Sequence, residues 1–110
     1  MPDLANIDVA AFEASTAEAA RLLRALGNER RLMILCQLAD GERSVGDLQP
    51  RVGLSQSALS QHLAVLRAEG VVATRREGQT IWYRIADPAA VKVVETLAWI
   101  FCPPERKVTA

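Results

Sequence analysis

The sequence has no apolar run approaching the ~20 residues that a helix needs to cross a bilayer. Its N-terminus, MPDLANIDVAAFEAST, lacks the basic start and long apolar stretch of a secretory signal. Neither of its two cysteines belongs to a Cys-x-x-Cys motif or has a catalytic base next to it, which argues against a thiol oxidoreductase. We therefore expect a cytoplasmic protein that is not an enzyme and does not bind a membrane.

The chain of 110 residues fits one domain, and a hydrophobic content of 50% is enough for a packed core. It contains no internal repeat and no low-complexity segment. We predict a single domain over residues 1–110, with a flexible N-terminal arm at 1–14 and a flexible C-terminal tail at 103–110.

The net charge is zero, with 13 basic and 13 acidic residues, but the charges are not evenly distributed. Residues 1–29 carry two arginines against five acidic residues, whereas residues 43–84 carry six arginines against three. A polyanion responds to clustered charge more than to the total. The basic middle of the chain is therefore compatible with a nucleic-acid partner.

Apolar periodicity, capping residues and turn residues predict five helices and one hairpin. Ser44 and Asp47 have the spacing of a capping box, and Gly70 suits the left-handed position that follows a helix. The predicted elements, in chain order, are helices over about 15–26, 29–40, 44–53 and 55–69, a hairpin over 71–87, and a helix from 88 to about 102. This order is that of a mainly α winged helix-turn-helix.

The segment SVGDLQPRVGLSQSALSQHLAVLRAEGVV matches two short helices separated by a turn, the second of which enters the major groove in a helix-turn-helix. On that second helix, Leu59, Leu63 and Leu66 form the predicted inward stripe. The outward polar residues predicted to contact bases are Gln56, Ser57, Ser60 and Gln61. Ser55 and His62 are predicted to contact the DNA backbone. The alternative is a solvated polar face on an ordinary helical pair.

The hairpin ATRREGQTIWYR places basic and polar side chains around a glycine turn. Arg75, Arg76, Gln79 and Thr80 are predicted to contact DNA phosphates. The alternative is that the arginines only protect an edge strand from pairing with another chain. Trp82 and Tyr83 alternate in facing, so one of them is expected to pack in the core.

Over residues 15–102 these segments together resemble the ArsR/SmtB family of winged-helix repressors. LLRALGNERRLMILCQL, the SQSALSQHLAVLR segment and the TRREGQTIWYRI hairpin carry the resemblance. It implies a homodimer formed through the first and last helices and bound to a palindromic operator, with recognition helices about 34–36 Å apart. It also implies that an inducer releases the DNA.

Two known metal-binding places of that family are not matched here. Residues 42–48 contain no cysteine, and the last helix carries Asp87 and Glu95 but no histidine. Zinc sites take four ligands and trigonal thiolate sites take three sulfurs, so we predict neither a metal nor another cofactor. A metal-responsive repressor remains an alternative.

Cys36 and Cys102, by their separation and helix positions, resemble the persulfide-sensing branch of the family (SqrR/BigR-type repressors). The resemblance implies that both thiols react with persulfide or polysulfide, become linked, and release the operator. A general thiol-oxidation sensor is the second alternative. From residue type and the helical spacing of Leu32, Leu35, Cys36 and Ala39 alone, Cys36 would instead be expected in the core. A winged-helix dimer that assembles with proteins rather than DNA is a further alternative.

Overall fold

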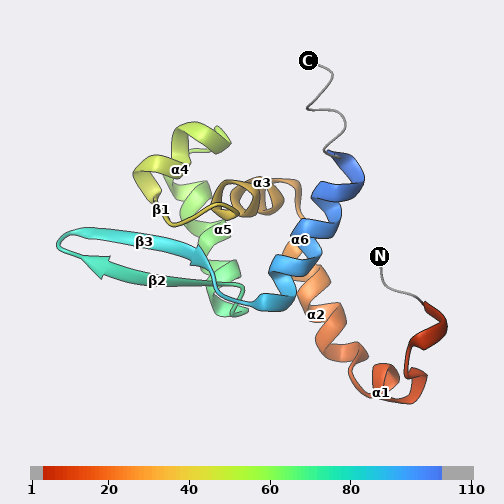
Figure 1. Cartoon of the computed structure of the whole chain (residues 1–110). Helices are drawn as coiled ribbons and strands as arrows, with labels where there is room; N and C mark the ends of the chain where they lie inside the picture. Colours follow the sequence, from red (N-terminus) through yellow and green to blue (C-terminus); the bar gives the residue numbers. More distant parts are fainter. Residues whose placement is uncertain (1–3, 103–110) are drawn as a thin grey trace.

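The computed structural model describes residues 4–102, and it confirms the predicted winged helix-turn-helix (Figure 1). The helices are a 3-10 turn at Leu4–Asn6, α1 (Val9–Ala14), α2 (Thr16–Leu26), α3 (Glu29–Leu38), α4 (Val45–Val52), α5 (Gln56–Ala68) and α6 (Pro88–Phe101). The strands are β1 (Arg43–Ser44), β2 (Val72–Glu77) and β3 (Thr80–Ile85). No helix of this part of the chain is long and apolar enough to cross a membrane.

Three elements were not predicted from the sequence, and the first is the 3-10 turn at Leu4–Asn6. Within the predicted N-terminal arm, Asp8 caps α1 by accepting a hydrogen bond from the Ala11 amide at 3.1 Å, so part of the arm is helical. The two-residue strand β1 pairs antiparallel with β3 and widens the hairpin into a sheet of order β1-β3-β2. The predicted tail at 103–110 lies outside the described residues.

The α4-turn-α5 unit owes its geometry to local sequence signals. The Ser44 hydroxyl accepts from the Asp47 amide at 3.1 Å, and the Asp47 carboxylate accepts from the Ser44 amide at 3.4 Å, which confirms the capping box. Gly53 ends α4 with φ of 67°, a left-handed conformation that glycine adopts without steric cost. Ser55 then caps α5 by accepting from the Ala58 amide at 3.2 Å.

The core lies between α5, α3 and the base of the sheet. The predicted inward stripe of α5 is confirmed, because Leu59, Leu63 and Leu66 are at most 1% exposed. The buried residues of the core are Ala25, Leu26, Ile34, Leu35, Leu38, Leu48, Val52, Leu59, Leu63, Leu66, Val71, Val72, Ala90 and Val94.

The α3 helix buries part of the face that its spacing suggested, because Leu35 is buried and Leu32 packs against the core, but Ala39 is exposed. Ile34, Leu35 and Leu38 are the buried residues of α3, whereas Cys36 is exposed. The expectation from residue type that Cys36 lies in the core is therefore wrong. Apolar side chains occur around most of α3, and contacts with its neighbours select which of them are covered.

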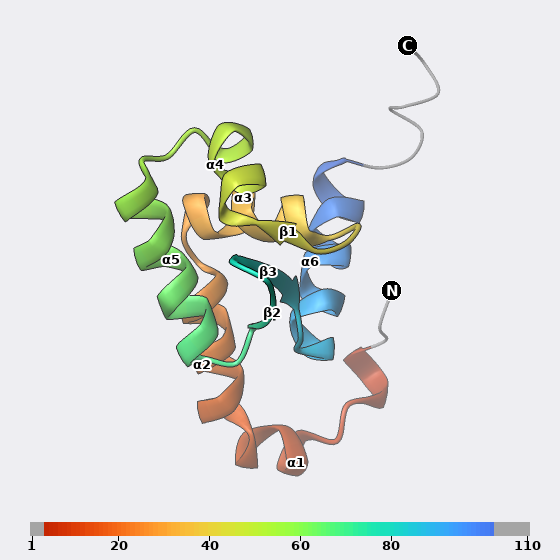
Figure 2. The same cartoon turned by 90° about the vertical axis from the view of Figure 1, so that its left-hand side faces the viewer.

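The hairpin of β2 and β3, which we call the wing, extends away from the helices in Figure 1. Seen along the wing in Figure 2, α5 lies on one side of its base and α6 on the other. The described ends of the chain lie on the side of the molecule away from the wing tip (Figure 1). The wing and the outer face of α5 are therefore both accessible to a partner, whereas α6 lies on the side of the molecule that carries the described ends of the chain.

Candidate nucleic-acid interface and cysteine pair

The N-terminal half of α5 presents a row of short polar side chains. Gln56, Ser57, Ser60 and Gln61 are exposed on it, opposite the buried leucine stripe. No side-chain hydrogen bond to the rest of the protein holds either glutamine or Ser60 within residues 4–102, so their donors and acceptors are available for base edges.

The two residues predicted beside this row to contact the DNA backbone differ in exposure. Ser55 is exposed and already accepts the capping hydrogen bond from Ala58, but its hydroxyl can still donate to a phosphate. His62 is half-buried one helical turn beyond Ala58, on the side of α5 nearer the core.

The tip of the wing carries the remaining predicted backbone contacts. Gln79 and Thr80 are exposed at the turn. Arg76 is also exposed, and its Nε donates to the Gly78 carbonyl at 3.2 Å. That bond uses one of the five guanidinium N–H groups, which leaves the others free to meet phosphate.

Arg75, predicted to contact the DNA backbone, also has partners within the protein. Its Nε lies 2.8 Å and 2.9 Å from the two carboxylate oxygens of Glu42, and a terminal nitrogen lies 3.2 Å from Glu77. These hydrogen bonds, first that of Glu42 and then that of Glu77, raise the pKa of Arg75 above its ordinary value. Protein carboxylates therefore hold Nε and one terminal nitrogen of Arg75, and its remaining N–H groups are available to a phosphate.

The two neighbouring aromatic residues of β3 have separate roles. Tyr83 packs against the core, which confirms that one of the pair faces inward. The Arg75 guanidinium lies 5.6 Å from the centroid of the Trp82 ring, within the range of a cation–π contact. Trp82 is half-buried, and its indole Nε1 is covered yet has no hydrogen-bond partner within the described part of the chain.

Glu42 is the residue of this region that sequence reasoning missed. It stands 33 residues before Arg75, outside every predicted element. Glu42 is an acidic residue just before the helix-turn-helix, and nothing in the sequence around it indicates a partner on the wing. Its contact with Arg75 could therefore be identified only from the structure.

Both cysteines are free and exposed. Cys36 lies on α3 at the edge of a hollow of about 440 Å³ that is also lined by Leu32 and Met33. Cys102 forms the C-cap of α6, where its amide donates to the Ala98 carbonyl at 2.7 Å. The two helices that carry these thiols pack against each other. Within residues 4–102, no three histidine, cysteine or acidic side chains gather as a set that could hold a metal ion.

A helix-turn-helix with an outward polar face, followed by a basic wing, defines the class of winged-helix DNA-binding proteins. Residues 28–74 match the model of a family described as "Bacterial regulatory protein, arsR family". The chain is 44% identical to the biofilm growth-associated repressor of Agrobacterium fabrum over 106 residues, which cover 96% of this chain and 91% of that protein. It is 48% identical to the transcriptional activator HlyU of Vibrio cholerae, over 89% of this chain and 91% of the other.

Solved structures show the same likeness. A structure of reduced HlyU from Vibrio cholerae superposes with a TM-score of 0.79 at 50% identity, over 83% of this chain and 96% of the other. The transcriptional repressor BigR from Xylella fastidiosa superposes with a TM-score of 0.82 at 42% identity, over 87% of this chain and 98% of the other. The chain belongs to the ArsR family, and it is similar to the BigR-like members. It is a DNA-binding transcriptional regulator from a family of non-enzymes.

Proposed function

We propose that the protein is a homodimeric, cytoplasmic repressor whose operator is released when Cys36 and Cys102 react with persulfide or polysulfide. The observation that carries this proposal is that both thiols are exposed on helices that pack together. The similarity to a protein named a repressor supports the direction of regulation. The description of one similar structure as reduced HlyU supports a role for thiol state.

The dimer is proposed to form through α2 and α6. Leu23 on α2 is 60% exposed, and Trp99 and Ile100 on α6 are 56% and 51% exposed. Clustered apolar side chains at one helix end are costly to leave in water and mark a protein interface. A second copy of the chain covers them in this arrangement, and two-fold symmetry then requires a palindromic operator.

DNA recognition is proposed to divide between two elements. Gln56, Ser57, Ser60 and Gln61 read base edges in the major groove, with Ser55 and His62 on the adjacent backbone. Arg76, Gln79 and Thr80 of the wing hold the backbone beyond. Arg75 contacts the backbone with the guanidinium N–H groups that Glu42 and Glu77 do not use.

The persulfide supplies the oxidised sulfur, so linking the two thiols needs no other oxidant. Each cysteine takes the outer sulfur of a persulfide RSSH, which releases one RSH per cysteine and converts both thiols to persulfides. One cysteine persulfide then attacks the other, forming a trisulfide between Cys36 and Cys102 and releasing one H₂S. A direct disulfide requires Cα atoms about 4.4–6.8 Å apart, and each additional sulfur lengthens the link by about 2 Å.

The test is a release titration on a DNA duplex enriched by the wild-type protein from a random library. Inorganic polysulfide, hydrogen peroxide and zinc are added separately to wild type, Cys36→Ser and Cys102→Ser. We expect polysulfide to release wild type at the lowest dose and neither serine variant at that dose. Mass spectrometry should then find added sulfur between the two cysteines.

Three outcomes contradict the proposal. Release by peroxide at the same dose, with a link that has only lost two hydrogens, indicates a general thiol-oxidation sensor. Release by zinc with the cysteines unchanged indicates a metal-responsive repressor. Failure of the wild type to bind any enriched duplex in a salt-dependent way indicates an assembly module instead.

A further inference from the structure

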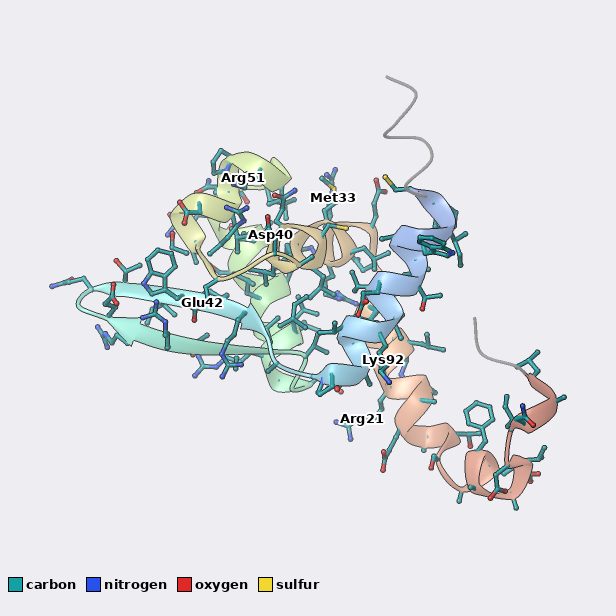
Figure 3. All side chains as sticks on the ribbon, viewed as in Figure 1. Arg21, Met33, Asp40, Glu42, Arg51 and Lys92 are labelled. Carbon is teal, nitrogen blue, oxygen red and sulfur yellow. The ribbon has the colours of Figure 1, made fainter. Side chains whose placement is uncertain are left out.

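A charge cluster outside the proposed base contacts lies on the outer half of the wing, where Arg75 is opposite Trp82. Both carboxylate oxygens of Glu42 bond the Arg75 guanidinium, at 2.8 Å and 2.9 Å. Figure 3 labels Glu42 against the ribbon of the wing. Both oxygens accept from the same Nε–H, and a charge-assisted hydrogen bond of this kind is shorter and stronger than a neutral one.

The segment that carries Glu42 is itself fixed to the body of the protein. The next residue, Arg43, donates from Nε to the Gln37 carbonyl of α3 at 2.7 Å and lies 3.5 Å from Asp40. Arg43 and Ser44 also form β1, opposite Tyr83 and Trp82 of β3. Glu42 therefore contacts the wing from a segment anchored on α3.

The wing side of the contact is equally well supported. Arg75 and Trp82 are opposite each other across β2 and β3, and the guanidinium lies over the indole ring. The indole Nε1 is covered although no described residue accepts its hydrogen bond. An unpaired covered donor carries an energetic cost, so the exchange of this N–H reports on how firmly Arg75 is held over the ring.

We propose that Glu42 is a positioning residue for DNA binding, because it holds Arg75 and thereby sets the direction in which the wing leaves the body. The wing tip carries Arg76, Gln79 and Thr80, whose reach to the DNA backbone depends on that direction. This inference rests on the proposed contact between the wing and DNA, but it does not involve the cysteines.

Glu77 provides a matched control. It contacts the same guanidinium at 3.2 Å, but it lies on β2 two residues from Arg75 and cannot tie the wing to anything else. Glu42→Ala and Glu77→Ala each remove one carboxylate from Arg75 and one negative charge from the DNA-binding side. General electrostatics predicts that both variants bind DNA at least as tightly as wild type.

If Glu42 positions the wing, only the Glu42 variant should lose DNA affinity. Glu42→Ala should weaken binding to the enriched duplex by about fivefold or more, whereas Glu77→Ala should bind as tightly as wild type or more tightly. In an Arg75→Gln background, Glu42→Ala should cause no further loss, because the carboxylate acts through Arg75. Denaturant unfolding of each variant checks that the fold is retained.

A second readout needs no DNA. The indole N–H resonance of Trp82, assigned by its persistence in a Trp99→Phe variant, should exchange with solvent about tenfold faster in Glu42→Ala and unchanged in Glu77→Ala. Tighter DNA binding by Glu42→Ala would overturn the proposal, because Glu42 would then be withholding Arg75 from phosphate. Faster exchange with unchanged DNA affinity would also overturn it. A wild type insensitive to polysulfide would leave both readouts intact and contradict only the thiol trigger.

Discussion

Two helices of similar length, α5 and α6, use their outer faces for opposite purposes. Each buries an apolar stripe, Leu59, Leu63 and Leu66 on α5 and Ala90 and Val94 on α6. Outside that stripe, the first half of α5 is polar, whereas the end of α6 exposes Trp99 and Ile100. The inner stripes specify that both helices pack on this core, and the outer faces specify what each helix meets next.

The difference follows from the solvent properties of the two partners. Base edges in a DNA groove remain hydrated until contacted and are matched by hydrogen-bonding side chains. A second protein chain is matched by apolar area removed from water. The contrast can therefore be tested by changing one face at a time.

The largest effect is expected from placing a charge on the outer face of α6. Trp99→Asp should dissociate the proposed dimer and weaken operator binding by about 100-fold or more, because the second half-site then no longer binds intramolecularly. Sedimentation and a DNA-binding titration measure the two effects. Trp99→Phe, which keeps an apolar ring, should remain dimeric. A wild type that sediments as a monomer would refute the role assigned to this face.

The inner stripe of α5 should affect stability instead. Leu63 is 1% exposed, and Leu63→Ala should lower the free energy of unfolding by about 2–5 kcal/mol through lost burial and a cavity. Gln61→Ala, two residues earlier on the exposed face, should change it by no more than about 0.5 kcal/mol. Urea unfolding measures both changes in the free energy of unfolding. Equal changes would mean that stability does not depend on which face of α5 is altered.

The same exposed glutamine should govern sequence preference. Gln61→Ala should lose about 1–3 kcal/mol of discrimination at one base-pair position while it keeps affinity for unrelated duplexes. Selection from a randomised duplex library, compared with wild type, locates that position. An unchanged selected sequence would show that Gln61 reads no base.

The smallest effect is expected at the wing tip. Arg76→Ala should weaken binding to specific and random duplexes alike and reduce the slope of log affinity against log salt by about 0.9, the value of one phosphate contact. Titrations at several salt concentrations give the slope. A changed sequence preference with an unaltered salt slope would show that Arg76 recognises a base instead of contacting the DNA backbone.

Where local signals carry the fold, the sequence was sufficient. The capping box of Ser44 and Asp47, the left-handed Gly70 and the leucine stripe of α5 each act within one or two helical turns, and the structure confirms all three. The polar row of α5 could be predicted for the same reason, because the inward stripe determines which residues face outward.

Where a choice depends on distant neighbours, the sequence was insufficient. The apolar residues of α3 allow more than one inward face, and packing leaves Cys36 exposed where its residue type suggested burial. The two-residue strand β1 is too short to show alternation, and it exists because β3 offers unpaired backbone groups. The contact between Arg75 and Glu42 joins residues 33 positions apart, and it could not be predicted from the sequence.

Hydrogen bonds and apolar periodicity over a few residues specify the order of the predicted elements, the capped helix-turn-helix and the polar face of the recognition helix, so these features could be read from the sequence. Packing within the folded chain sets which side chains of α3 are covered and which carboxylates hold Arg75. Both depend on contacts between residues far apart in the sequence, and local sequence patterns do not indicate which distant residues will be in contact.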